Sequence, residues 1–117
     1  MIDHFIDVLM QHINTISKIY YEEAPVNAEF PYGVLTSLQT RTLDYGILCN
    51  FDIEFYVNEL STTNIEAVCD TLRTNLDKFS YHDSIMGFYL SYDDQILSKQ
   101  KEQDFSYRRI SFIARIF

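Results

Sequence analysis

Alternating apolar and polar residues dominate residues 46–58, which read GILCNFDIEFYVN. Successive side chains of a strand point to opposite faces, so this period of two predicts a strand with one buried and one wet face. The residues expected on the buried face are Ile47, Cys49, Phe51, Ile53, Phe55 and Val57. At about 3.3 Å per residue the strand would span roughly 40 Å, which is long for a strand. We therefore expect a central strand that bends over the core or runs past it.

Two stretches have the spacing of three and four that is typical of an amphipathic helix. The first helix is predicted over residues 1–17, with Ile2, Phe5, Ile6, Leu9, Ile13 and Ile16 on its apolar stripe. The second follows Thr63, which has capping-box spacing to Glu66. Its apolar stripe consists of Ile65, Val68, Cys69, Leu72 and Leu76. Each helix has a single stripe, so each is expected to lie on a sheet.

Further strands are predicted at residues 18–23, 31–38, 85–92 and 105–117. In the last of these, the core side would carry Ile110, Phe112, Ala114 and Ile116. Residues 39–45 and 79–84 are predicted turns, and residues 93–104 are predicted to be a long mobile loop or the frayed tip of a hairpin. This order predicts one α+β domain over residues 1–117. We expect a two-layer sandwich in which a mostly antiparallel sheet of about five strands carries two helices on one face.

The face of the sheet away from the helices is expected to be unusually apolar. Its expected residues, set among charges, are Leu48, Tyr56, Tyr89, Tyr107 and Ile113. Exposed aromatic residues often mark a contact surface, and self-assembly would cover it. The alternative is that strand twist and long side chains hide these rings.

Charge is spread unevenly along an otherwise ordinary globular composition, in which 47% of 117 residues are apolar. The formal net charge is −8; residues 1–60 hold nine acids and two bases, whereas residues 61–117 hold eight acids and seven bases. So acidic a chain is poorly suited to bind nucleic-acid phosphates, and sequence-specific nucleic-acid binding is not expected. The asymmetry would suit head-to-tail self-association, although solubility explains it equally well.

Membrane segments, signal peptides and cysteine positions indicate the cellular compartment in which a chain resides. No apolar run approaches the length of a membrane-spanning helix, and residues 1–10 lack the features of a signal peptide. Cys49 and Cys69 fall on predicted inward faces without metal-ligand spacing. We expect them to be buried free thiols in a reducing compartment.

No catalytic motif stands out in the sequence. It contains no G-x-S-x-G, P-loop, Gly-rich dinucleotide turn or H-E-x-x-H. His4 and His12 are expected to be solvated on their helix, and His82-Asp83 sits in a predicted turn with no nucleophile near it in sequence. We therefore expect no enzyme and no cofactor or metal site.

The only basic cluster lies within residues 107–115. It could stack bases or bind phosphate, pair with an acidic neighbouring surface, or be solvated strand charge. The acidic N-terminal half of a second copy could supply this neighbouring surface. The residues assigned to an interface on this hypothesis are Asp52, Glu54, Tyr56, Tyr89, Tyr107, Arg108, Arg109 and Arg115.

Residues 19–35 resemble the opening of the small tail-terminator, or tail-completion, proteins of long-tailed phages. The resemblance is carried by Ile19-Tyr20-Tyr21-Glu22-Glu23-Ala24-Pro25 and by Ala28-Glu29-Phe30-Pro31-Tyr32-Gly33-Val34-Leu35. The later order of a long alternating strand, a capped helix and a closing pair of strands is also similar. Unlike the common form of the family, the chain has no tryptophan.

The resemblance implies a subunit that assembles into a ring, usually a hexamer, which caps the tail tube at its head-proximal end and joins it to the head. Its partners would be further copies of itself, the tail tube protein and head–tail connector proteins, with loops 39–45 and 93–104 as contacts. It would reside in the virion tail, or in the host cytoplasm during assembly, without enzymatic activity or cofactor. The alternatives are a small dimeric α+β binding module for a peptide or small ligand, and a minor enzyme on the same sandwich.

Overall fold

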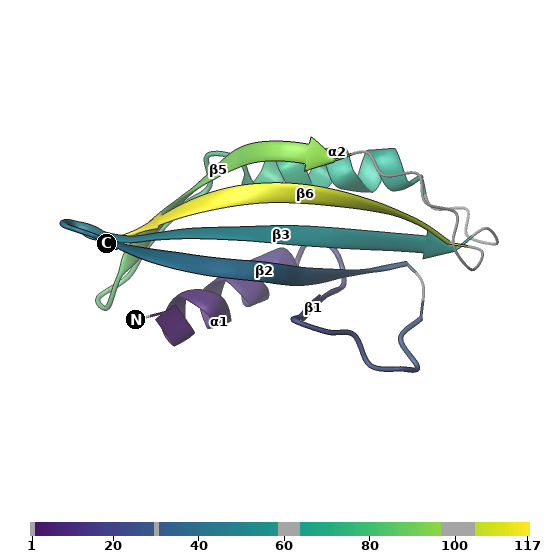
Figure 1. The fold of residues 1–117 in the computed structure, drawn as a ribbon, viewed down its shortest axis with the longest axis horizontal. Coiled ribbons are helices and arrows are strands. Elements are labelled where there is room, and N and C mark those ends of the chain that lie inside the picture. Colours follow the sequence, from purple (N-terminus) through teal and green to yellow (C-terminus); the bar gives the residue numbers. More distant parts are fainter. Residues whose placement is uncertain (1, 30, 59–63, 97–104) are drawn as a thin grey trace.

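The computed structural model describes residues 2–29, 31–58, 64–96 and 105–117. The elements in chain order are α1 (Ile2–Ile13), β1 (Ile19–Tyr21), β2 (Tyr32–Leu43), β3 (Gly46–Asn58), α2 (Ile65–Leu76), β4 (Ser80–His82), β5 (Gly87–Ile96) and β6 (Phe105–Ile116). The molecule measures 46 × 25 × 21 Å. Its long axis follows β3 and β6, which lie side by side (Figure 1).

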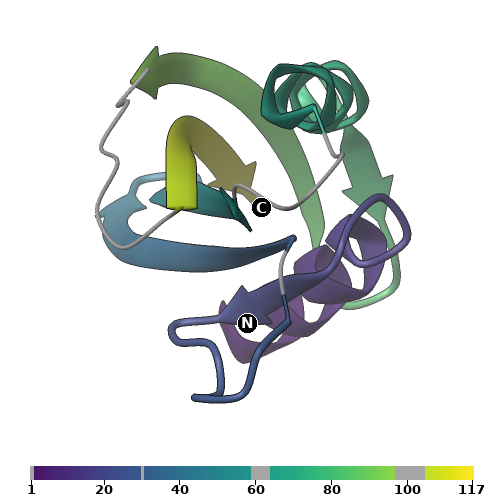
Figure 2. The same ribbon diagram turned by 90° about the vertical axis from the view of Figure 1, so that its right-hand side faces the viewer.

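The described strands form one sheet in the order β1-β2-β3-β6-β5-β4. β1 is parallel to β2, and all other neighbours are antiparallel. The predicted, mostly antiparallel sheet is therefore confirmed, but it has six strands instead of about five. The sheet also curls strongly (Figure 2), so the fold is not the clear two-layer sandwich that the sequence predicts.

Two β-bulges lie at the same level of the sheet. One follows Thr36 in β2, where Ser37 has a φ of 58°, and the other precedes Asp94 in β5. Both flank the row in which Asp52 of β3 lies opposite Ser111 of β6. A bulge bends its strand and increases the local twist. The paired bulges therefore contribute to the curl of the sheet across its middle.

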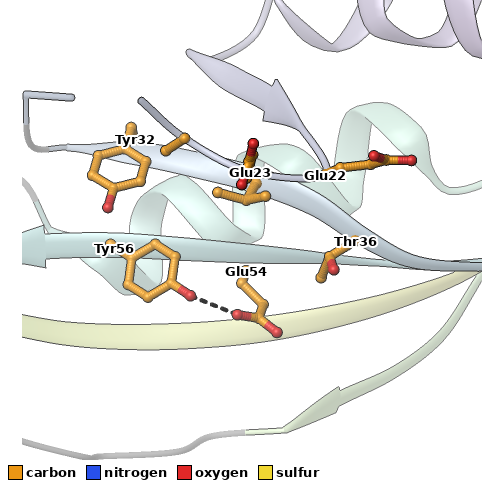
Figure 3. A pocket seen from close by; sticks show the side chains of 8 residues that line it. Glu22, Glu23, Tyr32, Thr36, Glu54 and Tyr56 are labelled. Atoms are coloured by element: carbon orange, nitrogen blue, oxygen red, sulfur yellow. Dashed lines mark hydrogen bonds between the residues drawn. The ribbon is translucent and has the colours of Figure 1, made fainter. Parts of the chain in front are cut away.

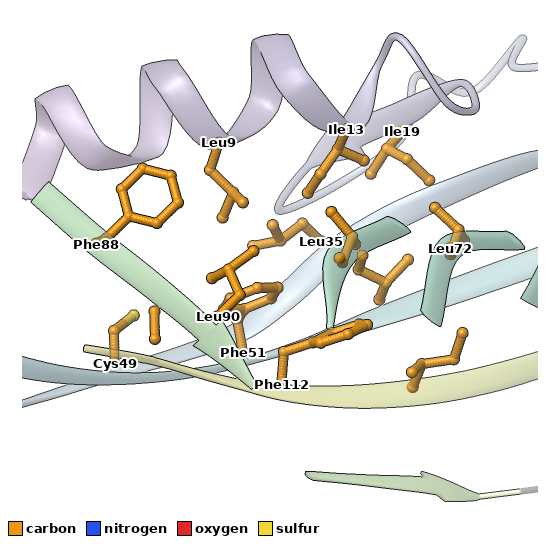
Figure 4. Packing of buried hydrophobic residues seen from close by; sticks show 14 of the residues in the cluster. Leu9, Ile13, Ile19, Leu35, Cys49, Phe51, Leu72, Phe88, Leu90 and Phe112 are labelled. Atoms are coloured by element: carbon orange, nitrogen blue, oxygen red, sulfur yellow. The ribbon is translucent and has the colours of Figure 1, made fainter. Parts of the chain in front are cut away.

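Side chains of β3 and β6 form the centre of the hydrophobic core (Figure 4). The buried residues are Cys49, Phe51, Ile53, Phe55 and Val57 from β3 and Ile110, Phe112, Ala114 and Ile116 from β6. The rings of Phe51 and Phe112 stack with their centroids 5.6 Å apart. The predicted faces of both strands are thus confirmed, except that Ile47, at the end of the row, is only half-buried.

Both helices bury their apolar stripes in this same core, which confirms that they cover one face of the sheet. The fully buried residues are Phe5, Leu9 and Ile13 of α1 and Cys69, Leu72 and Leu76 of α2. α1 ends at Ile13, four residues before its predicted end. Asn14 closes it, because Asn14 Oδ1 accepts from the Ile19 N–H at 3.1 Å while Asn14 Nδ2 donates to the Met10 carbonyl at 2.8 Å.

The N-cap of α2 is Asn64, and the predicted cap at Thr63 is wrong. Asn64 Oδ1 accepts from the backbone N–H groups of Glu66 at 3.0 Å and Ala67 at 3.3 Å. Asparagine is at least as good an N-cap as threonine, so the capping-box spacing of Thr63 to Glu66 was not decisive. Thr63 itself lies outside the described residues.

Two predicted loops are partly strand. β2 continues to Leu43 through most of the predicted turn 39–45. β5 continues to Ile96, and the remainder of the predicted mobile loop, residues 97–104, lies outside the described residues. Thr40, Arg41 and Thr42 are all exposed. This end of β2 is wet on both faces, so it lacks the alternation that identifies a half-buried strand.

The predicted turn 79–84 contains the short strand β4, which pairs with β5 over Ser80–His82. Three residues are too few to display a period of two. Tertiary pairing with Phe88 and its neighbours therefore decides their conformation.

The two cysteines are free and fully buried, as predicted. Burial raises the pKa of the Cys49 thiol to about 11 and that of the Cys69 thiol to about 12. Because the thiolate is the reactive form, neither side chain is a nucleophile at neutral pH.

The prediction that the two helix histidines are freely solvated is wrong, because each contacts a residue that flanks β4. His12 stacks on Phe79 with ring centroids 3.8 Å apart, and its partial burial lowers its pKa. His4 Nε2 lies 2.7 Å from Asp83 Oδ2, which also accepts from the Tyr81 hydroxyl at 2.8 Å. Asp83 thereby ties the start of α1 to the turn before β5.

We expect Phe112→Ala to lower the free energy of unfolding by about 3–5 kcal/mol, because it would leave a cavity opposite Phe51. Urea denaturation followed by circular dichroism would measure the loss. The matched control is Ile113→Ala, one position along β6 on the opposite, half-buried face, for which we expect roughly 1 kcal/mol. Equal losses would contradict the assignment of the two faces.

We expect Asp83→Asn to destabilise the fold at neutral pH and progressively less in acid. Hydrogen bonds from His4 and from the Met86 and Ile85 amides hold the pKa of Asp83 well below its ordinary 3.8. The ionised carboxylate therefore stabilises the folded state above about pH 4, and this contribution disappears as the pH falls further.

Urea titrations between about pH 2 and pH 7 would follow the difference in unfolding free energy between wild type and Asp83→Asn. Asp44→Asn, at an exposed turn position, is the control and should show no such trend. A difference that stays constant with pH would refute the role given to the Asp83 carboxylate.

Candidate assembly surface

The outer face of β3 and β6, which points away from the helices, carries a compact polar network. Arg109 Nη2 donates to Glu54 Oε1 at 3.0 Å, and its Nε lies 3.9 Å from Asp52 Oδ2. The Tyr56 hydroxyl donates to Glu54 at 2.5 Å, and the Ser111 hydroxyl donates to Asp52 at 2.6 Å. The sequence predicts all of these charges on one face, and the structure brings them together. Much of their charge is balanced within the chain.

Arg108, although adjacent to Arg109, lies on the helix side of the sheet with 5% of its surface exposed. Its Nε donates to Glu66 Oε1 at 2.8 Å, and its Nη2 lies 2.6 Å from the same oxygen. A buried arginine needs such a partner to offset its desolvation. Arg108 therefore fastens the first turn of α2 to β6 and is not on the outer face with the other predicted interface arginines.

Arg115 is exposed near the opposite end of β6. In register it lies opposite Leu48 of β3 on one side and Tyr89 of β5 on the other. Tyr89 is 39% exposed, so this row keeps both aromatic and cationic character at the surface. Tyr107 lies opposite Tyr56 in the ladder, which places it at the far end from Arg115.

A polar pocket of about 270 Å³ opens where the start of β2 meets the loop after β1 (Figure 3). Its lining residues are Glu22, Glu23, Ala24, Tyr32, Val34, Thr36, Glu54 and Tyr56. The rings of Tyr32 and Tyr56 lie 5.4 Å apart. Three carboxylates make this edge of the outer face acidic.

A second, more apolar groove of about 380 Å³ lies at the tip of the β2–β3 hairpin. It is lined by Leu43, Tyr45, Ile47, Arg115, Ile116 and Phe117. Tyr45 is 93% exposed and Phe117 is 60% exposed. Sequence reasoning missed this groove because it joins a turn residue to the far end of the chain. Its only sequence signal is an aromatic residue in an otherwise polar turn.

Two glycines fix the shape of this groove. Gly46 has a φ of 137°, and a side chain there would collide with the carbonyl of Ile116, so the position requires glycine. Gly87 exchanges backbone hydrogen bonds with Phe117 at 2.7 and 2.9 Å. A Cβ on Gly87 would lie only 2.7 Å from the Phe117 ring. The last residue of the chain is therefore held in a defined place beside the hairpin tip.

Within the described ranges, no group of three His, Cys, Asp or Glu side chains is arranged to hold a metal ion. Neither described helix has the length and apolar character that a membrane crossing requires. Near the centre of the outer face, Asp52, Glu54, Tyr56, Arg109 and Ser111 bond to one another.

Comparison with known proteins yields a fold match. No family model matches the chain, and no curated protein matches it. Among solved structures, it is similar to a chain from the "Virion of native gene transfer agent (GTA) particle", with a TM-score of 0.67 and 16% identity. The match covers 93% of this chain and 84% of that chain. At this identity, the two proteins are shown to share a fold.

We expect Glu54 and Arg109 to be coupled in a double-mutant cycle with Glu54→Gln and Arg109→Met. The two side chains are 18% and 37% exposed, so the coupling in unfolding free energy should be about 0.5–1 kcal/mol and should weaken in high salt. A parallel cycle between Glu66→Gln and Arg109→Met is the control. Those two residues belong to opposite faces, so any comparable coupling there would contradict the network.

Proposed function

We propose that this chain is a structural virion subunit, and specifically a tail terminator that forms a ring capping the tail tube and joining it to the head. The observation that carries the proposal is the shared fold with a chain of a gene transfer agent virion over 93% of the length. The resemblance of residues 19–35 to tail-terminator proteins supports the finer assignment. The first line of support compares backbone geometry over most of the chain, and the second compares residue identities in one segment.

The residues that carry the resemblance form one structural unit. β1 pairs in parallel with the start of β2, with Ile19 opposite Gly33 and Tyr21 opposite Leu35. A side chain on Gly33 would clash with Ile19 Cδ1, so glycine permits this close approach. The matching sequence therefore corresponds to a short strand, an exposed loop and a strand start that pack as a unit.

In this proposal the partners are further copies of the chain, the tail tube protein and head–tail connector proteins. The protein would be located in the virion tail, and in the host cytoplasm during assembly. It would act as neither an enzyme nor a cofactor carrier. The buried, protonated thiols and the internally paired carboxylates of the outer face are in keeping with a structural role.

A ring requires a heterologous interface, in which one patch of a subunit meets a different patch of the next. The described chain has two such patches, the acidic pocket at the start of β2 and the apolar groove at the hairpin tip. Two unlike patches therefore supply what a ring contact needs, and the mass of the particle distinguishes the ring from the dimeric binding module.

We expect the purified protein at high concentration to form closed rings of about six copies. Size exclusion with light scattering at several protein concentrations would give the mass, and negative-stain images would show whether the particles are closed. A dimer of fixed mass at every concentration would contradict the ring and favour the alternative, a binding module for a peptide or small ligand.

A further inference from the structure

Of the four most exposed large apolar side chains of the described residues, three lie on two separate parts of the surface, and the fourth is Ile85 in the turn before β5. Val26 is fully exposed in the loop after β1. Tyr45 and Phe117 are exposed beside the groove at the hairpin tip. Figure 1 places the loop in the right half of the view and the hairpin tip, with the C-terminus, at the left. One copy therefore cannot bring its own loop to its own groove.

The loop, residues 22–29, presents Val26 at the apex of a turn. The Pro25 carbonyl accepts from the Ala28 N–H at 2.9 Å, which closes a four-residue turn with Val26 and Asn27 at its centre. The base of the loop is fixed by the Glu22 N–H, which donates to the Leu35 carbonyl at 2.8 Å. The apolar apex is thus part of an ordered projection.

Acidic residues flank this apex in the sequence. Glu22, Glu23 and Glu29 are exposed, and none forms an ion pair with another described residue. The projection therefore combines one exposed apolar side chain with three exposed acidic residues. We call residues 22–29 the acidic turn.

The groove has the complementary chemistry. Its walls are mostly apolar, but Arg115 lines it, and Arg41 lies on the same face, because both arginines are opposite Leu48 in the ladder. Arg41 and Arg115 are exposed and form no ion pair with the described residues. By contrast, Arg109 already binds Glu54. Arg115 and Arg41 are therefore the cations best placed for an external carboxylate.

We propose that the acidic turn of one copy docks in the hairpin-tip groove of another, with Val26 against its apolar walls and the turn carboxylates beside Arg115 and Arg41. Both halves of the contact belong to this chain, so the occupant is a second copy. Repeated in one direction from copy to copy the contact is heterologous, and made reciprocally between two copies it gives a dimer. Only the closure of such a chain into a ring rests on the function proposed above.

Disulfide trapping tests this contact directly. Val26→Cys protein carrying a size tag would be mixed with untagged Tyr45→Cys protein and oxidised. Both sites are exposed, and the native cysteines are buried with raised pKa values, so they would not compete. The control mixture pairs Val26→Cys with Thr74→Cys, at an exposed position on α2.

The proposal expects a tagged–untagged heterodimer in the first mixture, at several times the yield of the control. A yield no higher than that of the control would overturn the proposal. That result is also the one expected if the loop or the groove binds a different protein and not a second copy. Both single variants change exposed side chains, so folding is preserved and circular dichroism can confirm it.

Charge reversal gives a second, independent measurement. Arg115→Glu should raise the protein concentration at half-association by about tenfold, because it places like charges in contact. Adding Glu23→Arg to this variant should restore part of the lost association. Arg73→Glu, an exposed arginine on α2, is the matched control and should have little effect. Association unaffected by Arg115→Glu would overturn the proposed docking.

The outcomes for this contact and for the proposed function can be told apart. Heterodimer trapping with particles that are open filaments or fixed dimers would support the docking and reject the ring. Closed rings without trapping, and with unchanged association of Arg115→Glu, would reject the docking and leave the proposed function standing.

Discussion

The antiparallel ladder between β3 and β6 is the constraint on which the rest of the structure depends. It runs from the Ile47–Ile116 pair to the Asn58–Phe105 pair without a break in register. Its unbroken period of two places one apolar row under both helices, with Phe51 stacked on Phe112 at the centre. β2 and β5 attach to its two sides and carry the bulges that curl the sheet. A slip of one residue would exchange the core row for the charged row.

Two adjacent arginines on β6 have different roles because this ladder directs their side chains to opposite faces of the sheet. Arg108 points to the core side and is fixed by Glu66 at the start of α2. Arg109 points outward and is balanced by Glu54 and Asp52. The first attaches a helix to the sheet, and the second keeps the outer face polar and ordered. The cationic character that remains open to a partner lies farther along, at Arg115.

The surface available for assembly is therefore concentrated away from the centre of the outer face. Hydroxyls and carboxylates there bond to one another, whereas the acidic turn and the hairpin-tip groove are open. Gly46 and the backbone pairing of Gly87 with Phe117 hold the groove in shape. Unlike patches toward the two ends of an elongated subunit suit the repeated contact between copies that we propose.

By itself, the sequence determined the local, periodic features: the faces of residues 46–58 and 105–117, the two amphipathic helices and the burial of both cysteines. Each depends on the period of apolar side chains within one segment, which can be recognised without knowing what that segment packs against. Tertiary structure alone decided the extension of β2 to Leu43, the pairing of His4 with Asp83 and the groove that joins Tyr45 to Phe117. These depend on residues distant in sequence, or on strand ends that are wet on both faces and so carry no period.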